Sequence, residues 1–226
     1  MTQVSILFYL TIAVMVADWI AADRKSRRVR YFTKPAALIL LILWFTQAGQ
    51  WQGVLIWFGI ALVFSLLGDI FLLFEQRFFI FGLTAFLFAH ICYLVGFNQT
   101  FPAINAQTLL VLVAVGAIAV AIFSYVLKGM NRNPKTRKLR IPVIFYGLVI
   151  SLMVASAILN FYRAGWSVPT AILTSLGAGL FFASDSMIAI RNFVTRFNHD
   201  DYLVMLTYHL GQLMITAGVL LQFTKQ

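Results

Sequence analysis

Cysteine is almost absent from this chain, whose 226 residues include only Cys92. A single cysteine excludes an intrachain disulfide and a metal cluster held by several thiolates. No His-Glu-x-x-His or His-x-x-x-His spacing occurs either, so the sequence predicts no metal site and implies no cofactor. Every lysine is expected in a loop or at a terminus, which argues against a retinal Schiff base.

Charged residues are scarce as well. They make up 11% of the chain, whereas 62% of the residues are hydrophobic. The mean hydropathy is +0.90, and no soluble domain of this length can bury so much apolar surface. The sequence therefore predicts an integral membrane protein.

Apolar stretches of around 20 residues, the length that crosses a bilayer as a helix, recur along the whole chain. Met1 to Ser5 contains no lysine or arginine, so the first stretch is not expected to be a cleaved signal peptide. We expect one all-α domain, 1–226, a polytopic bundle of eight transmembrane helices. The eight predicted spans are 4–22, 35–48, 54–74, 78–97, 108–127, 141–160, 168–190 and 202–223.

The net charge of +10 arises from basic residues that gather in alternate loops. With eight spans, 15 of the 17 lysines and arginines fall on one side, leaving only Arg163 and Lys225 on the other. Such a split is the positive-inside rule and predicts that both termini are non-cytoplasmic, in a bacterial inner membrane. The basic residues then set topology and attract anionic membrane lipids, and nucleic acid is not an expected partner.

The two halves of the chain, 1–102 and 103–226, share a pattern that is consistent with a repeat of four spans. The third span contains Gly68-Asp69 and the seventh contains Ser184-Asp185. Four spans is an even number, so two such repeats have the same orientation in the membrane. This arrangement places Asp69 and Asp185 at the same depth, where they can face each other.

Three acidic residues, Asp18, Asp69 and Asp185, lie within predicted spans. A carboxylate at the centre of a membrane helix costs about 2.5–3.5 kcal/mol on insertion scales, so it usually faces a bundle interior and has a function. Two carboxyl groups that meet in an apolar cavity do not both ionise easily, so one keeps its proton. The pair is then suited to general acid–base chemistry.

Polar residues of the last span support a cavity at this depth. Tyr208, Gln212 and Thr216 are spaced i, i+4 and i+8 and form one stripe. Residues of this kind also serve purely as hydrogen-bond partners between membrane helices. His90 and Tyr93, three residues apart, share a face of the fourth span, where a lone histidine is more often a packing residue than a ligand.

Small residues and prolines give two further expectations. Ser175, Gly179 and Ala183 form a line on the seventh span, which predicts that another helix approaches Asp185 closely. Pro35 and Pro142 are expected at the starts of helices, where a missing N–H is harmless.

Together these motifs resemble the YhhN/TMEM86 family of membrane lysoplasmalogenases. The resemblance covers nearly the whole chain and rests on the order and spacing of short segments. These segments are Lys34-Pro35, Gly68-Asp69, Ala85 to Tyr93, Ala183-Ser184-Asp185-Ser186 and Tyr208-His209-Leu210-Gly211-Gln212.

The resemblance implies hydrolysis of the vinyl ether of lysoplasmalogens, without a metal or organic cofactor. The products are a fatty aldehyde and glycerophosphoethanolamine or glycerophosphocholine, and Asp69 and Asp185 are the implied catalytic pair. The reaction protonates the β-carbon of the vinyl ether and leaves an oxocarbenium ion, which water then attacks. One carboxylic acid and one carboxylate suit these two steps.

A lysophospholipid substrate is expected to enter from the leaflet with its tail among the phenylalanine-rich helices. Lys34 or Arg77 is then expected to hold the phosphate, and Tyr93 and Tyr208 to pack on the choline or ethanolamine cation. The remaining predicted substrate-binding residues are His90, Ser184 and Gln212.

Two other functions remain open on the sequence. A proton-coupled or lipid transporter also uses paired membrane carboxylates and repeats, and a non-enzymatic membrane scaffold is a third reading. Breaks in the middle of a span favour a transporter, and the prolines at predicted helix starts argue against it.

Overall fold

The computed structural model describes residues 5–74 and 78–224, and within them every regular element is helical. Eight helices are long and apolar enough to cross a membrane, which confirms the predicted all-α bundle. They are α1 (Ile6–Asp23), α2 (Arg27–Gly49), α3 (Leu55–Leu73), α4 (Phe79–Phe97), α5 (Ala106–Asn131), α7 (Arg140–Ile158), α8 (Val168–Phe193) and α9 (Asp200–Phe223). The short α6 (Pro134–Arg137) precedes α7, and the 3-10 helix η2 (Leu159–Tyr162) follows it.

Helix α2 begins at Arg27, well before the predicted start of the second span. Pro35 therefore lies inside the helix, and its expected place at a helix start is wrong. Arginine and lysine are good helix formers, so the basic segment continues the helix outward beyond the apolar run. Pro142 and Pro169 do lie in the first turns of α7 and α8. The extension of α2 places Lys34 within the bundle instead of in a loop.

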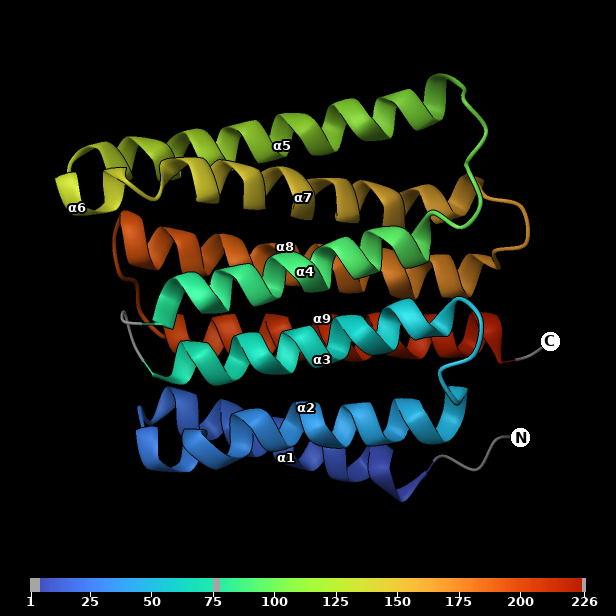
Figure 1. The fold of residues 1–226 in the computed structure, drawn as a ribbon, viewed down its shortest axis with the longest axis horizontal. Helices are drawn as coiled ribbons and strands as arrows, with labels where there is room; N and C mark the ends of the chain where they lie inside the picture. The colour runs from blue at the N-terminus through green and yellow to red at the C-terminus, as the bar shows by residue number, and fades with distance from the viewer. Residues whose placement is uncertain (1–4, 75–77, 225–226) are drawn as a thin grey trace.

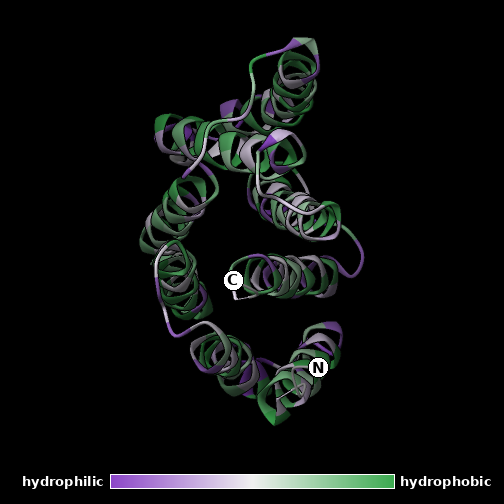
Figure 2. Cartoon of the chain, turned by 90° about the vertical axis from the view of Figure 1, so that its right-hand side faces the viewer, coloured by the Kyte–Doolittle hydropathy of each residue, from purple (hydrophilic) through white to green (hydrophobic). Residues whose placement is uncertain are grey.

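Successive long helices run in opposite directions, and both chain ends lie at the same end of the bundle (Figure 1). Helix α9 packs against α8, α1, α2 and α3. A view along the bundle shows α9 inside the curve formed by the other helices (Figure 2). Polar residues on α9 are therefore placed to contact several other helices at once.

Within each half of the chain, each long helix packs on the next one. The order is α1, α2, α3 and α4 in the first half, and α5, α7, α8 and α9 in the second. This order is the one that a four-span repeat requires, and the repeat itself stays a prediction.

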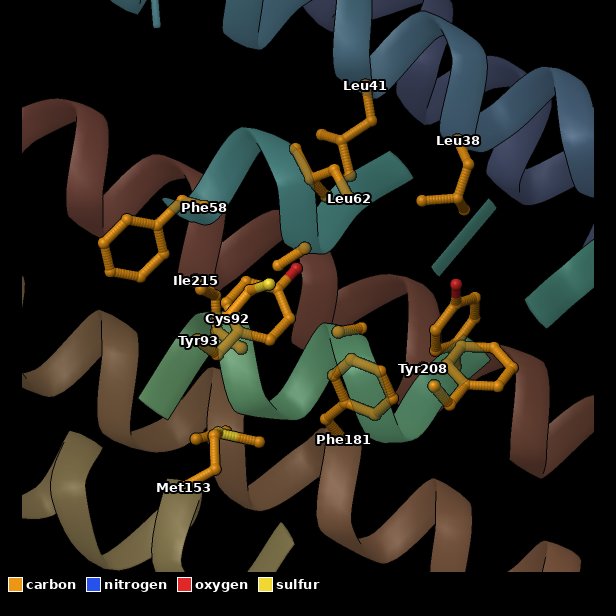
Figure 3. Packing of buried hydrophobic residues seen from close by; sticks show 14 of the residues in the cluster. Leu38, Leu41, Phe58, Leu62, Cys92, Tyr93, Met153, Phe181, Tyr208 and Ile215 are labelled. Atoms are coloured by element: carbon orange, nitrogen blue, oxygen red, sulfur yellow. The ribbon is translucent and has the colours of Figure 1, made fainter. Parts of the chain in front are cut away.

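Aromatic and aliphatic side chains from α2, α3, α4, α7, α8 and α9 form one core (Figure 3). The rings of Phe58, Tyr93 and Phe181 are at most 1% exposed. On the outside, by contrast, Leu110 and Val120 of α5 are 67% and 70% exposed. Large apolar side chains exposed in this number suit contact with lipid and not with water.

Helices α8 and α9 come into backbone contact at two glycines. A Cβ atom on Gly211 would lie 2.8 Å from the carbonyl oxygen of Gly177 and 2.9 Å from the backbone nitrogen of Phe181. At Gly179, a Cβ would meet nothing within 4 Å. The line that contains Gly179 meets a neighbouring helix at Ser175, whose hydroxyl donates to the carbonyl oxygen of Ala157 on α7 at 3.0 Å, and it is open at Gly179. The close approach to α9 occurs on a different face of α8, because the line of small residues does not indicate which side of a helix its neighbour occupies.

Arg163 ties α4 to the end of α7 at the end of the bundle that carries both termini. Its guanidinium donates to the carbonyl oxygens of Thr100, at 2.9 Å, and Ser156, and to the side-chain oxygens of Asn160 and Asn98, at 2.6 and 2.5 Å. Burial lowers the pKa of Arg163 to about 10, so the group keeps its charge at neutral pH. A cation is favourable there because the carbonyl ends of helices carry partial negative charge.

The glycine contact leads to a test of the packing of α8 on α9. We expect Gly211→Ala to force the two backbones apart and to destabilise the protein by about 1–3 kcal/mol. On soluble proteins of this size, such a change lowers the Tm by roughly 3–10 °C. The measurement is thermal unfolding in detergent, followed by circular dichroism.

Gly179→Ala is the matched control, because the new methyl group enters open space. Alanine is favoured over glycine inside a helix by about 1 kcal/mol, so this variant should be as stable as the parent or slightly more stable. Equal melting temperatures for the two variants would contradict the backbone contact.

Candidate functional site

Asp69, in the last turns of α3, is almost completely buried, at 1% exposure. Its Oδ1 lies 3.0 Å from Nζ of Lys34 on α2, and its Oδ2 accepts a hydrogen bond of 2.9 Å from the hydroxyl of Tyr208 on α9. A buried carboxylate is costly unless it is paired and hydrogen-bonded, and here both oxygens have a donor. Asp69 is thus held as an ion pair that joins three helices.

Asp185, on α8, has a different set of partners. Its Oδ2 lies 3.0 Å from Nε2 of His90 on α4 and accepts a hydrogen bond from the hydroxyl of Tyr146 on α7. His90 Nε2 and the Tyr146 hydroxyl are themselves 2.9 Å apart, so the three groups form a triangle. With the proton on Nε2, a neutral His90 donates to the carboxylate. Both donors converge on Oδ2, which leaves Oδ1 as the oxygen without a donor from the described residues.

Asp185 lines a narrow crevice between α4, α7 and α8. Apart from Tyr146 and Ser186, the other wall residues are apolar and include Leu83, Phe86, Ile150 and Phe193. The cavity volume is about 40 Å³, which is enough for about two or three water molecules and too small for a lipid chain. A carboxyl group at the wall of an apolar crevice is well placed to act on an apolar ligand, provided that side chains move apart to admit it.

The two carboxyl groups occupy neighbouring sites with an aromatic boundary between them. The ring centroid of Phe181 lies 4.7 Å from that of His90 and 5.2 Å from that of Tyr208. Phe86 lines the crevice, and its ring also packs on Tyr208 and above Gly68, the residue before Asp69. In the described part of the chain, no hydrogen bond or ion pair joins Asp69 to Asp185.

The remaining predicted site residues have partners within the bundle. The Tyr93 hydroxyl donates to Oε1 of Gln212 at 2.5 Å, and the Gln212 side-chain nitrogen is buried without a partner among the described residues. Ser184 donates to the backbone carbonyl of Val204 at 3.0 Å, which ties α8 to α9. Arg77 lies outside the described residues.

A chain of polar residues leads from Asp69 toward the end of the bundle where α2 and α9 begin. Lys34 lies within electrostatic range of Asp18 on α1, which is fully buried and accepts a hydrogen bond of 2.6 Å from Thr33. Asp18 is also 3.9 Å from Nε of Arg30, whose Nη1 lies 3.4 Å from Oδ1 of Asp201. We call Asp69, Lys34, Asp18, Thr33, Arg30 and Asp201 the polar ladder.

Sequence reasoning missed several of these groups. Tyr146 lies inside the predicted span 141–160, and Arg30 and Asp201 lie between predicted spans, so none of the three was predicted as a site residue. The one signal available for Tyr146 was its phenol within a mostly apolar span. In residues 5–74 and 78–224, no group of three or more histidine, cysteine, aspartate or glutamate side chains is arranged to hold a metal ion.

Comparison with known proteins places these residues in a family. The YhhN family model matches residues 29–219. Lysoplasmalogenase TMEM86B of Rattus norvegicus is 28% identical over 96% of this chain and 80% of its own length. A lysoplasmalogenase of Mycobacterium bovis is 31% identical over 93% of this chain and 68% of its own length. The uncharacterized membrane protein YhhN of Escherichia coli is 27% identical over 93% and 98%, respectively. No solved structure matches the chain.

The buried ion pair gives a prediction that does not depend on any activity. Lys34→Met leaves the Asp69 carboxylate buried without its cation, and loss of one partner of a buried pair costs about 3–5 kcal/mol. We expect the double variant Lys34→Met/Asp69→Asn to be more stable than Lys34→Met, because it contains no unpaired charge. Thermal unfolding of both single variants and the double variant measures this coupling.

Lys128→Met is the control, since this lysine is exposed and the change should shift stability by less than about 0.5 kcal/mol. Strictly additive effects of the two substitutions would show that the pair does not contribute as a unit.

Proposed function

Because this chain belongs to the YhhN family, in which curated relatives are named lysoplasmalogenase, we propose that it hydrolyses the vinyl ether bond of lysoplasmalogens. The observation that supports this most directly is the Asp185 carboxyl group at the wall of an apolar crevice. An alkenyl chain needs an apolar channel, and its vinyl ether needs an acid within that channel. The crevice provides the apolar surface, and Asp185 provides the acid.

The reaction begins with transfer of a proton from Asp185 to the β-carbon of the vinyl ether. The carbon–carbon double bond supplies the electron pair, and the positive charge spreads over the α-carbon and the ether oxygen. Water then adds to the α-carbon and loses a proton to the Asp185 carboxylate. The resulting hemiacetal breaks its bond to the glycerol oxygen, which takes up the hydroxyl proton, and this yields the fatty aldehyde and the glycerophospho alcohol. One water molecule is consumed and Asp185 regains its proton.

Asp185 is assigned as the acid because its surroundings contrast with those of Asp69. Its hydrogen bonds converge on Oδ2, so Oδ1 is free to carry the transferable proton. After transfer, Tyr146 and His90 stabilise the carboxylate by donating to it. In Asp69 both oxygens are engaged, one of them by a cation. A general acid contributes about 10²–10⁴-fold to rate.

Asp69 is the second carboxylate of the proposal, with a positioning and electrostatic role. Lys34 and Tyr208 hold it ionised beside the crevice, and Phe86 separates it from the bound chain. In a medium of low dielectric constant, its charge acts over several ångströms and favours the oxocarbenium ion. Its effect on the rate should therefore be smaller than that of Asp185.

The test is turnover of a 1-alkenyl lysophospholipid by the purified protein in detergent, with aldehyde release as the readout. We expect Asp185→Asn to lower kcat by at least about 1,000-fold, because an amide cannot donate a proton to carbon. Tyr146→Phe, which removes only a hydroxyl group, should lower kcat by about tenfold. Asp69→Asn should lower kcat by about 10- to 100-fold.

The 1-alkyl ether analogue is the matched control substrate, since it has no double bond to protonate and should release no aldehyde. Size-exclusion profiles establish that each variant is folded. If the parent protein releases no aldehyde from either lipid, the enzyme assignment is wrong. Turnover of Asp185→Asn at the parent rate would remove Asp185 from the mechanism.

A further inference from the structure

A polar pocket lies at the end of the bundle opposite the chain termini, between the end of α1 and the start of α9. Its cavity volume is about 270 Å³, and its walls include Lys25, His199, Asp200, Asp201 and Tyr202. This pocket is much roomier than the apolar crevice, and its walls are largely charged. Such a pocket suits a charged ligand of modest size.

Two carboxylates of this pocket each have one oxygen that accepts no hydrogen bond from the described residues. Asp200 is 5% exposed, and its Oδ2 is buried without a hydrogen-bond donor among the described residues. The carboxylate of Asp201 lines the same pocket. Asp23, which also lines it, is engaged by His199 Nδ1 at 2.5 Å. Oδ2 of Asp200 can accept a hydrogen bond but has no donor, and a ligand that carries N–H groups would supply one.

Two guanidinium groups meet on the other side of Asp201. Nη1 of Arg191, from α8, lies 2.6 Å from Asp201 Oδ1, and Nη1 of Arg30, from α2, lies 3.4 Å from the same oxygen. The Nε atoms of both arginines are buried without a hydrogen-bond partner in the described part of the chain. Paired arginines with spare N–H groups are a favoured arrangement for binding phosphate.

Arg30, Arg191 and Asp201 each lie a fixed distance along their helix from a residue of the two buried carboxyl sites. At about 1.5 Å per residue, Arg30 is about 6 Å along the axis from Lys34, and Arg191 about 9 Å from Asp185. On the same scale, Asp201 is about 10 Å from Tyr208, two turns away on the same face of α9. In an extended lysophospholipid, bonds of about 1.5 Å place the phosphorus roughly 6 Å, and the headgroup nitrogen roughly 11 Å, from the ether oxygen.

We propose that Arg30, Arg191 and this pocket form the headgroup site of the lysolipid, and that the site selects a zwitterionic headgroup with a primary ammonium. The proposal rests on the proposed function and names the substrate class for it. The phosphate binds Arg30 and Arg191, and the ammonium donates to Asp200 and Asp201. A headgroup without a cation leaves Asp200 uncompensated and Oδ2 of Asp201 without a donor, and a quaternary ammonium has no N–H for Asp200.

The experiment compares four 1-alkenyl substrates with the same chain: those with phosphoethanolamine, phosphocholine and phosphoglycerol headgroups, and 1-alkenylglycerol, which has no phosphate. We expect kcat/KM to be highest for the ethanolamine lipid and at least about tenfold lower for the phosphoglycerol lipid and for alkenylglycerol. The choline lipid should fall between these limits.

Variants of the site residues test whether this headgroup preference arises from the site. Arg191→Gln and Arg30→Gln should raise KM for the ethanolamine lipid by about 10- to 100-fold and change kcat by less than about threefold. The ratio of kcat/KM for the ethanolamine lipid to kcat/KM for alkenylglycerol should fall by the same factor. Asp201→Asn should remove the preference for ethanolamine over phosphoglycerol. Arg196→Gln, an exposed charge at the same end of the bundle, is the control and should behave as the parent protein.

Two results would overturn the headgroup site: a parent protein that turns over all four substrates equally well, or arginine variants that lose kcat equally on every substrate. Binding of the non-hydrolysable 1-alkyl lysophosphatidylethanolamine, followed by tryptophan fluorescence, separates this proposal from the enzyme assignment. Tight binding that Arg191→Gln weakens supports the site even if no aldehyde forms. Active enzyme whose binding is insensitive to Arg191→Gln contradicts the site alone.

Discussion

The bundle depends on the requirement that a charge removed from water must meet a partner inside the protein. Asp69 satisfies this requirement through Lys34 and Tyr208, which come from α2 and α9. Since the three residues belong to three helices, the ion pair fixes the relative positions of those helices more specifically than apolar packing does. The same requirement places Asp185 against His90 and Tyr146, from α4 and α7. The central position of α9 follows from it too, because the polar face of α9 must meet α1, α3 and α8 together.

The partners of the two carboxyl groups come from corresponding spans of the two halves of the chain. Asp69, on the third span, takes donors from the second and eighth spans, and Asp185, on the seventh span, takes donors from the sixth and fourth. Exchanging the halves of the chain converts one set of spans into the other. This correspondence is what a four-span repeat predicts. The chemistry differs at both donors, because a lysine of α2 stands where α7 supplies a tyrosine phenol, and a tyrosine of α9 stands where α4 supplies a histidine. The first difference gives Asp69 a lysine ammonium as its partner, whereas the corresponding partner of Asp185 is a phenol.

The sequence predicted the number of spans. Hydropathy and charge also led to the prediction that Asp18, Asp69 and Asp185 lie at a similar depth. Which side of a helix faces which neighbour depends on contacts between distant segments. For that reason the sequence did not predict Lys34 as the partner of Asp69, Tyr146 as a donor to Asp185, or Gly177 and Gly211 as the contact of α8 with α9. The start of α2 was missed because a hydropathy window ends where the basic residues begin, whereas the helix continues through them.

Two environments of opposite character meet at the depth of the carboxyl groups. The crevice beside Asp185 is apolar and leads among phenylalanine side chains, while the polar ladder from Asp69 leads to Arg30 and Asp201 at the end of the bundle. A single-chain lipid has the same division, with the bond between its two parts at the junction of tail and head. In the proposed reaction, the acid that protonates carbon must stay out of bulk water, and the water that completes the hydrolysis must still reach it. Asp185 at the apolar crevice, with the polar ladder ending at the neighbouring Asp69, meets both conditions.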